Sequence, residues 1–245
     1  MRSQAQRGAK QLRPLKLTPN WLHHADGSCL IEMGKTRVVA AASVASGVPP
    51  FLKGKGQGWL TAEYGMLPGS TSDRTQREAA KGKQSGRTVE IQRLIGRSLR
   101  QCVDMALLGE NTVTVDCDVL DADGGTRTAS ISAGYVALYL AVRRAIKTKT
   151  ILVKGFPVVS PVAAVSVGIV DGKPRLDLDY ELDVKAGVDM NVVMNGEGRF
   201  IEVQGTGEHA SFSRGELDTL LDFARHGILG IFDAQRLALK RAGVQ

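Results

Sequence analysis

Apolar runs of strand length, each bounded by turn residues, recur along the chain and predict β-strands. The stretches are residues 28–44, 56–67, 111–120, 162–180 and 190–204. Residues 28–44 form two such runs around Gly34-Lys35, where a glycine supplies the positive φ of a hairpin turn. The last two stretches are divided in the same way, at 171–174 and at 195–198, so they predict two further hairpins.

Apolar residues recur at helical spacing in three other stretches, residues 88–106, 129–146 and 217–232. In the first, Arg93, Arg97 and Arg100 fall largely opposite the apolar side, which predicts an amphipathic helix with a basic face. The second is apolar around most of its circumference and is therefore expected to be a buried helix. Ser213 and Glu216 form a capping box ahead of the third.

Both halves of the chain thus predict paired strands followed by a helix, which indicates an α+β protein with an internal duplication of the fold. We place the two halves at about residues 10–150 and 151–240. A length of 245 residues lies at the upper end of a single domain, and no linker composition separates the halves. We therefore expect one compact domain over residues 1–245.

The chain carries a net charge of +7, and the excess of basic residues is uneven. Residues 1–16 contain five basic side chains and no acid, and residues 74–100 contain eight against two acids. Residues 68–87 also lack a sustained apolar period, which predicts a long basic loop. Such charge suits a polyanion such as a nucleic acid, although basic runs also occur as solvated faces, so charge alone leaves both interpretations open.

No apolar stretch reaches the roughly 20 residues of a membrane helix, and the N-terminal segment lacks the apolar part of a signal peptide. We therefore expect a cytoplasmic protein without a membrane partner. Cys29, Cys102 and Cys117 are widely spaced within apolar patterns, which indicates reduced core residues. The four histidines show no metal-ligand spacing, and the chain has neither a nucleotide-triphosphate loop nor a dinucleotide fingerprint.

The stretch DADGGTRTAS, residues 121–130, joins the strand at 111–120 to the buried helix. Two glycines allow a tight turn and a close approach of the backbone to a ligand, and Thr126 and Thr128 could cap the helix. The free N–H groups of the helix start, together with Arg127, would suit a phosphate. A plain turn with threonine caps and an exposed arginine fits the spacing equally well. Asp121 and Asp123 must point away from any such anion or serve a cation.

Acidic residues cluster in LDLDYELDVKAGVDMN, residues 176–191. Asp177 and Asp179 are expected on one strand face, whereas Asp183 and Asp189 flank a short irregular segment. Two carboxylates brought together there could hold a hard cation such as Mg²⁺. A polar strand face that runs into an acidic turn is the competing interpretation.

With these residues assembled, the chain resembles the ribonuclease PH family of phosphate-dependent 3′ exoribonucleases. The matching segments follow the expected order over most of residues 10–230. They are FLKGKGQGWLTAEYGMLP (51–68), REAAKGKQSGRTVEIQRLIGRSLR (77–100), DCDVLDADGGTRTASIS (116–132), AAVSVGIVDG (163–172), LDLDY (176–180), DMNVVM (189–194) and FIEVQGTGE (200–208).

The resemblance implies an enzyme in which inorganic phosphate, as co-substrate, attacks the last phosphodiester of an RNA and releases a nucleoside diphosphate. It implies trimming of transfer-RNA precursors, with a role in ribosomal-RNA processing, and assembly as a homohexameric ring built as a trimer of dimers. A non-catalytic RNA-binding subunit of an exosome-like ring is the alternative.

By motif match, the resemblance also assigns residues to roles. Arg87, Gly125, Thr126 and Arg127 would hold the attacking phosphate. Asp183 and Asp189 would be catalytic together with Arg127 and would hold the divalent cation, Mg²⁺. Arg74 and Arg77 would bind RNA away from its 3′ end.

Three residues depart from the family pattern. Gly69 stands where an arginine is expected, which would weaken the binding of RNA. Asp121 replaces a neutral side chain, usually glutamine, beside the expected phosphate site. Leu182 stands where an acidic residue is expected before Asp183, so the last two departures bear on the charge balance of the site.

Overall fold

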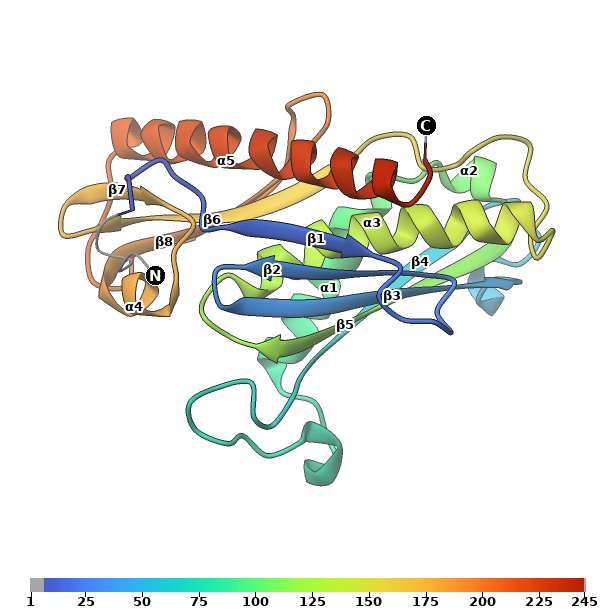
Figure 1. Ribbon diagram of the computed structural model, residues 1–245, viewed down its shortest axis with the longest axis horizontal. Coiled ribbons are helices and arrows are strands. Elements are labelled where there is room, and N and C mark those ends of the chain that lie inside the picture. The colour runs from blue at the N-terminus through green and yellow to red at the C-terminus, as the bar shows by residue number, and fades with distance from the viewer. Residues whose placement is uncertain (1–6, 245) are drawn as a thin grey trace.

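The computed structural model describes residues 7–244, which form two β-sheets joined through shared helices (Figure 1). The first sheet has the strand order β1 (Leu15–Pro19), β2 (Gly27–Met33), β3 (Thr36–Ser46), β5 (Asn111–Asp121) and β4 (Trp59–Met66). Its neighbouring strands are antiparallel except for β4 and β5, which are parallel. The hairpin predicted at Gly34 is confirmed, with φ of 60° at this glycine. Strand β1 was not predicted, because its sequence LKLTP is short and partly polar.

The second sheet contains four strands, all antiparallel to their neighbours. Their order is β7 (Lys173–Leu176), β6 (Val162–Val170), β8 (Ala186–Asn195) and β9 (Phe200–Thr206). Both predicted hairpins of this half are therefore present. Every residue of β6 is buried, as expected for a strand covered on both faces.

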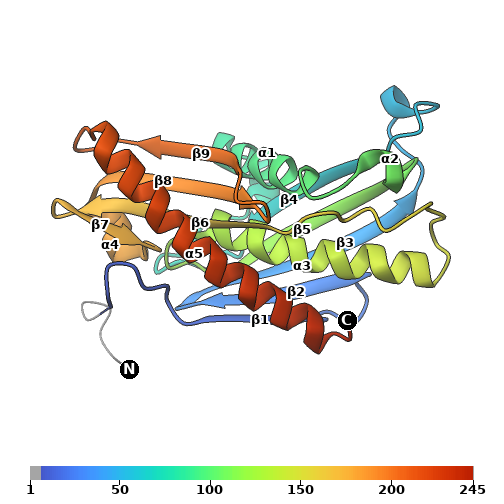
Figure 2. The ribbon, with the colours of Figure 1, turned by 90° about the horizontal axis from the view of Figure 1, so that it is seen from above.

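The described residues also form five α-helices: α1 (Gly86–Arg100), α2 (Met105–Leu108), α3 (Thr126–Lys147), α4 (Tyr180–Lys185) and α5 (Arg214–Arg241). Two short 3-10 helices, Pro50–Leu52 and Glu78–Lys81, complete the described elements. Helix α1 packs against β4, and α3 packs against β2 and β3. Helix α5 runs diagonally from the second sheet to β1, so that α3 and α5 both contact each sheet (Figure 2). The α+β fold class is thus confirmed, and the expected capping box of Ser213 and Glu216 begins α5.

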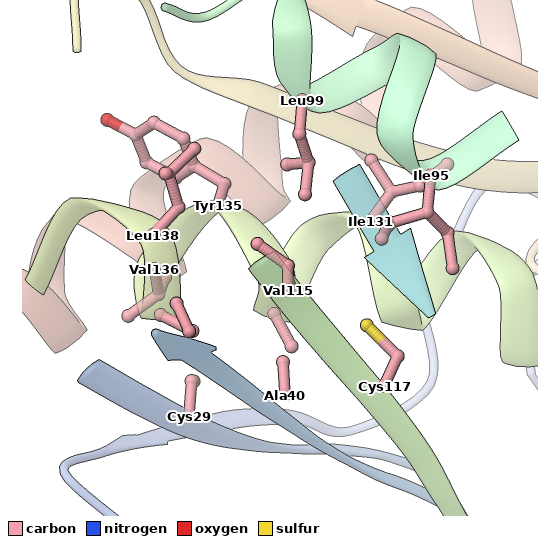
Figure 3. Close-up of a cluster of buried hydrophobic side chains, with 14 of the residues drawn as sticks. Cys29, Ala40, Ile95, Leu99, Val115, Cys117, Ile131, Tyr135, Val136 and Leu138 are labelled. Carbon is pink, nitrogen blue, oxygen red and sulfur yellow. The ribbon is translucent and has the colours of Figure 1, made fainter. Parts of the chain in front are cut away.

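Helices α1 and α3 cover the apolar face of the first sheet with one continuous core. Figure 3 shows Ile95 and Leu99 of α1 beside Ile131 of α3 and Val115 of β5. Each of these four side chains is fully buried. The three cysteines also lie in this core as free thiols, as predicted, and burial raises the pKa of the Cys29 thiol to about 12.

Two parts of the predicted fold are wrong. The helix expected over residues 88–106 ends at Arg100, and α2 is a separate short helix that begins at Met105. The strand expected over residues 175–180 ends at Leu176, so Asp177 and Asp179 do not share a strand face. Asp177 has a φ of 56°, which a continuing strand cannot accommodate. Asp179 instead caps α4, where its side chain accepts a hydrogen bond from the N–H of Leu182. The segment between Asp183 and Asp189, expected to be irregular, consists of the end of α4 and the start of β8.

Among residues 7–244, no helix is both long and apolar enough to cross a membrane.

Candidate functional site

The turn between β5 and α3 requires both of its glycines. Gly124 and Gly125 have φ of 76° and 69°, in the left-handed region that disfavours side chains. A Cβ atom on Gly124 would also lie 2.6 Å from the carbonyl oxygen of Leu178. The turn therefore packs directly against the segment that leads into α4, which brings residues of the two halves together.

Helix α3 begins at this turn with Gly125 as its N-cap residue, so no side chain caps it. The Thr126 hydroxyl is bonded to that of Tyr64, at 2.9 Å, and the Thr128 hydroxyl donates to the carbonyl oxygen of Gly125. The expected threonine caps are therefore absent, because both hydroxyls have other partners. The first N–H groups of α3, which lack partners within the helix, remain suited to an anion.

Arg127 lies at the same helix start and reaches between α1 and β9. Its Nη1 donates to Oε1 of Gln204 at 2.9 Å and lies 3.4 Å from both carboxylate oxygens of Glu90. Its side chain is only 16% exposed. The guanidinium of Arg127 is thus fixed in place next to the open end of α3.

Arg87 is the second residue of α1 and is exposed. Its positive charge is close enough to Tyr64 and Asp183 to lower the pKa of each, against the larger effect of burial that raises both. The structure therefore brings Arg87 and Arg127 to the same side as the start of α3, and their role as a phosphate site stays a prediction.

Asp183 and Asp189 come from α4 and β8, and their carboxyl groups lie within electrostatic range of each other. Partial burial raises the pKa of Asp183, and the negative charges of Asp189 and Glu208 raise it further. The pKa of Asp189 is also raised, by partial burial first and then by Glu208, while Arg127 opposes this effect. The predicted pair is thus assembled beside the two arginines.

The carboxylates of this pair fit a divalent cation. Oδ1 of Asp189 is buried without a hydrogen-bond donor among the described residues, and the mutual repulsion of the carboxylates would be relieved by a positive ion. No group of three or more histidine, cysteine, aspartate or glutamate side chains is arranged for a metal within residues 7–244. Two carboxylates nevertheless suit Mg²⁺, which keeps several water ligands in such sites.

The other acids of the predicted cluster have different partners. Asp177 is paired with Arg13, with 2.7 Å between Oδ1 and Nη2, and Asp179 caps α4. Oδ2 of Asp179 also lies 3.7 Å from Nη2 of Arg7, so Asp177 and Asp179 both have an arginine as their charge partner.

Arg74 and Arg77 lie on the segment between β4 and α1, which extends away from both sheets (Figure 1). Both are exposed. Arg77 is near enough to Asp118 of β5 to lower its pKa, although burial raises that pKa overall. The two arginines are therefore placed on a projecting loop, whereas Arg87 and Arg127 form part of the site.

The three departures from the family pattern have clear positions. Asp121 forms an ion pair with Arg37 of β3, so its carboxylate points towards that arginine. Leu182 packs in a small apolar cluster with Val170. Gly69 lies in an open depression of about 580 Å³ between the projecting loop and the hairpin of β2 and β3. No atom of residues 7–244 lies within 4 Å of the place that a Cβ on Gly69 would take.

Sequence reasoning missed Glu90, Gln204 and Glu208, which complete the surroundings of the site. Glu90 lies three residues after Arg87, so both stand on one side of α1. Gln204 and Glu208 lie in the matched segment FIEVQGTGE without any spacing that links them to Arg127 or Asp189. Only the pairing of β9 with β8 brings this segment to the site.

Solved structures of known proteins share this fold. Rrp46 from rice (Oryza sativa) is 20% identical, with a TM-score of 0.76 over 95% of this chain and 97% of that one. The Archaeoglobus fulgidus exosome with RNA bound to the active site is 23% identical, with a TM-score of 0.76 over 96% of this chain and 90% of that one. An archaeal exosome core is 22% identical, with a TM-score of 0.71 over 96% of this chain and 88% of that one.

Family models match the sequence itself in two consecutive parts. The model of domain 1 of the 3′ exoribonuclease family matches residues 11–143, and that of domain 2 matches residues 160–227. The matches include every residue of the site described above and together span most of the 245 residues. The chain therefore belongs to the 3′ exoribonuclease family of ribonuclease PH type.

Proposed function

We propose that the chain is a phosphate-dependent exoribonuclease that shortens RNA from its 3′ end and releases nucleoside diphosphates. The observation that carries this proposal is the convergence of a helix start without a cap, two arginines and two carboxylates in one site. A phosphate and a scissile phosphodiester are both anionic, so they require positive charge, and a cation would be held by the acids.

In the proposed reaction, an oxygen of inorganic phosphate attacks the phosphorus of the last phosphodiester. The new P–O bond forms as the bond from phosphorus to the 3′ oxygen of the preceding nucleoside breaks, and that oxygen takes up the proton that the attacking hydrogen phosphate gives up. Gly125, Thr126 and Arg127 would hold the attacking phosphate through backbone N–H groups and a guanidinium, and Arg87 would add a second charge. No covalent enzyme intermediate is needed.

Asp183 and Asp189 would hold Mg²⁺ close to the scissile phosphate. The ion would supply stabilisation of the negative charge that develops on the phosphate oxygens and the leaving oxygen. Arg127 would pair with the attacking phosphate while the two acids bind the ion, so acids and arginines have separate roles in one site.

We further propose that the substrates are the 3′ ends of transfer-RNA precursors and other RNAs in the cytoplasm. Arg74 and Arg77, exposed on the projecting loop, would bind the RNA backbone at a distance from the 3′ end. Assembly as a homohexameric ring, a trimer of dimers, is proposed from the family resemblance. The solved relatives include exosome assemblies, which supports a ring in general terms.

A non-catalytic RNA-binding ring subunit is the second candidate, because the structural neighbours include exosome components. Retention of Arg87, Arg127, Asp183 and Asp189 favours the enzyme, since a binding subunit needs no carboxylate pair beside a phosphate site.

The decisive experiment incubates the purified protein and Mg²⁺ with 5′-labelled RNA, with and without inorganic phosphate, and identifies the released nucleotides. We expect shortening only with phosphate, and nucleoside diphosphates as products. Release of monophosphates without phosphate would indicate a hydrolase. RNA binding without shortening under either condition would support the non-catalytic subunit. Arg127→Ala provides the control, because it should lose the use of phosphate while RNA binding is retained.

A further inference from the structure

A buried ion pair joins the N-terminal segment of the chain to the second half. Arg13 and Asp177 are 2% and 1% exposed. Two nitrogens of the guanidinium donate to the two carboxylate oxygens, with 2.7 Å between Nη2 and Oδ1 and 2.9 Å between Nε and Oδ2. The backbone N–H of Arg13 also donates to Oδ2, at 2.8 Å. Both carboxylate oxygens are therefore fixed by a residue that lies 164 positions earlier in the chain.

The same guanidinium holds the turn that precedes α3. Nη1 of Arg13 donates to the carbonyl oxygen of Asp123 at 2.5 Å, and Nη2 donates to that of Gly124 at 3.3 Å. Thr36 supports this turn from β3, because its hydroxyl donates to the carbonyl oxygen of Gly124 and accepts from the N–H of Asp123. Arg13 thus fixes the two carbonyl groups immediately before the expected phosphate site.

Asp177 fixes the segment that leads to the carboxylate pair. Its own N–H donates to the carbonyl oxygen of Ser166 in β6, at 2.7 Å, and the Ser166 hydroxyl accepts from the N–H of Leu178. Three residues after Asp177, α4 begins at Tyr180, and α4 carries Asp183. Arg7 adds a second guanidinium, which donates to the carbonyl oxygen of Asp177 at 2.7 Å.

We propose that Arg13 and Asp177 are positioning residues that set the separation between the phosphate site at Gly125 and Arg127 and the carboxylate of Asp183. This inference rests on the proposed function. Neither residue touches the reacting groups; each acts through backbone groups that it holds. Burial of an ion pair is a weak source of stability, because both charges lose their water, whereas fixed geometry is what such a pair provides best. A transfer between two phosphates depends on their alignment to a fraction of an ångström.

Arg13→Lys tests this inference, because lysine keeps the charge but cannot bridge Asp177 and two carbonyl groups at once. We expect inorganic phosphate to bind at least about tenfold more weakly, as measured by titration calorimetry, with a lower kcat for phosphorolysis and an unchanged KM for RNA. Asp177→Asn should also weaken phosphate binding and lower kcat while the KM for RNA stays unchanged. Its carboxamide has one oxygen, in place of two, that can accept hydrogen bonds from Arg13. Thr36→Val supplies a milder change at the same turn, and it should shift phosphate affinity in the same direction even if Arg13→Lys does not fold.

The matched control is Leu239→Ala in α5, which removes buried apolar contacts away from the site. It should lower the melting temperature while phosphate affinity and kinetic constants stay at wild-type values. The inference is overturned if the variants at Arg13, Asp177 and Thr36 behave like Leu239→Ala. Weaker binding of RNA and phosphate to the same degree would also overturn it. Failure of the proposed function is recognised separately, because wild-type protein would then bind no phosphate or bind it without any phosphorolysis.

Discussion

Arg127 and Glu90 form an ion pair between the starts of α3 and α1, with 3.4 Å between Nη1 and Oε2. Glu90 is 41% exposed, so solvent screens the pair. A phosphate bound at the start of α3 would compete with Glu90 for the guanidinium. Glu90 therefore both orients Arg127 and reduces the net positive charge that an incoming anion meets.

Glu90→Gln should raise the affinity for inorganic phosphate by about two- to fivefold, the range expected for a screened ion pair. The carboxamide can still accept a hydrogen bond from Arg127, so its orientation should be preserved. Titration calorimetry at fixed ionic strength measures the change. Asp218→Asn is the matched control, because it neutralises an acid that is also paired with an arginine, Arg214, in α5. Equal effects of the two variants would indicate a general charge effect and contradict the specific role of Glu90.

Gly69→Arg should increase RNA affinity, because it restores a basic residue to an open depression that already contains Lys35 and Arg37. No atom of the described residues lies within 4 Å of a Cβ at this position, so they leave room for the side chain. One added phosphate contact should steepen the dependence of log affinity on log salt by about one unit. Binding of single-stranded RNA at several salt concentrations tests this. Gly69→Ala should bind like wild type, and an unchanged salt slope in Gly69→Arg would exclude a phosphate contact.

Asp189→Asn should lower turnover by at least about a hundredfold and reduce the response of the rate to Mg²⁺, if this carboxylate helps to hold the ion. The orphaned Oδ1 would then belong to a neutral side chain that binds cations weakly. Initial rates at increasing Mg²⁺ and saturating phosphate give the comparison. Asp171→Asn in the turn between β6 and β7 is a control at an exposed acid. A rate that remains low while the Mg²⁺ dependence is unchanged would show that Asp189 does not hold the ion.

Most strands and helices could be predicted because their patterns are local. Strand β5 and helix α3 follow directly from the strict alternation before Asp121 and the apolar circumference after Thr126. The strand expected through Asp177 failed for a non-local reason, since Arg13 and Ser166 hold this residue in a left-handed conformation. The hydrophobic pattern of residues 175–180 cannot reveal that Asp177 has a partner more than 160 positions away in the sequence.

The candidate site likewise contains residues that the sequence reveals and residues that only the fold brings there. Arg127 and Asp183 were recognisable because charged residues stood next to glycines and other acids in short motifs. Gln204 and Glu208 were not recognisable, because their role depends on β9 lying against β8. The direction of Asp121 was likewise undetermined, since the register that places Arg37 opposite Asp121 belongs to the sheet.

Asp116→Asn should stabilise the folded protein at pH 7. Asp116 lies opposite Glu63 in the pairing of β5 with β4, and partial burial, then the charges of Glu63 and Asp118, raise its pKa. A carboxyl group with a raised pKa in the folded state disfavours folding once it is charged, so its contribution to stability is lost as pH rises through that pKa. The gain at pH 7 should be below about 1 kcal/mol.

The pH dependence distinguishes this effect from a general change in charge. The advantage of Asp116→Asn should shrink as pH falls through the raised pKa of Asp116 and vanish near pH 3, below the ordinary value of about 3.8. Urea unfolding at several pH values measures it, with Asp222→Asn on the exposed side of α5 as the control. A gain that persists at low pH would contradict the electrostatic explanation.

Gly124→Ala and Gly172→Ala separate two costs of replacing a glycine in the left-handed region. Their φ values are 76° and 69°, so alanine should strain both backbones by about 1 kcal/mol or more. At Gly172 no atom in the described part of the chain lies within 4 Å of an added Cβ. At Gly124 the added atom would lie 2.6 Å from the carbonyl oxygen of Leu178 and 2.7 Å from the carbonyl carbon of Asp179. Gly124→Ala should therefore cost at least about 2 kcal/mol more in the free energy of urea unfolding. It should also weaken phosphate binding, because relief of the collision moves the turn away from α4, whereas Gly172→Ala should leave phosphate affinity unchanged. Equal losses of stability in the two variants would mean that the contact between this turn and the segment before α4 is too loose to set the geometry of the site.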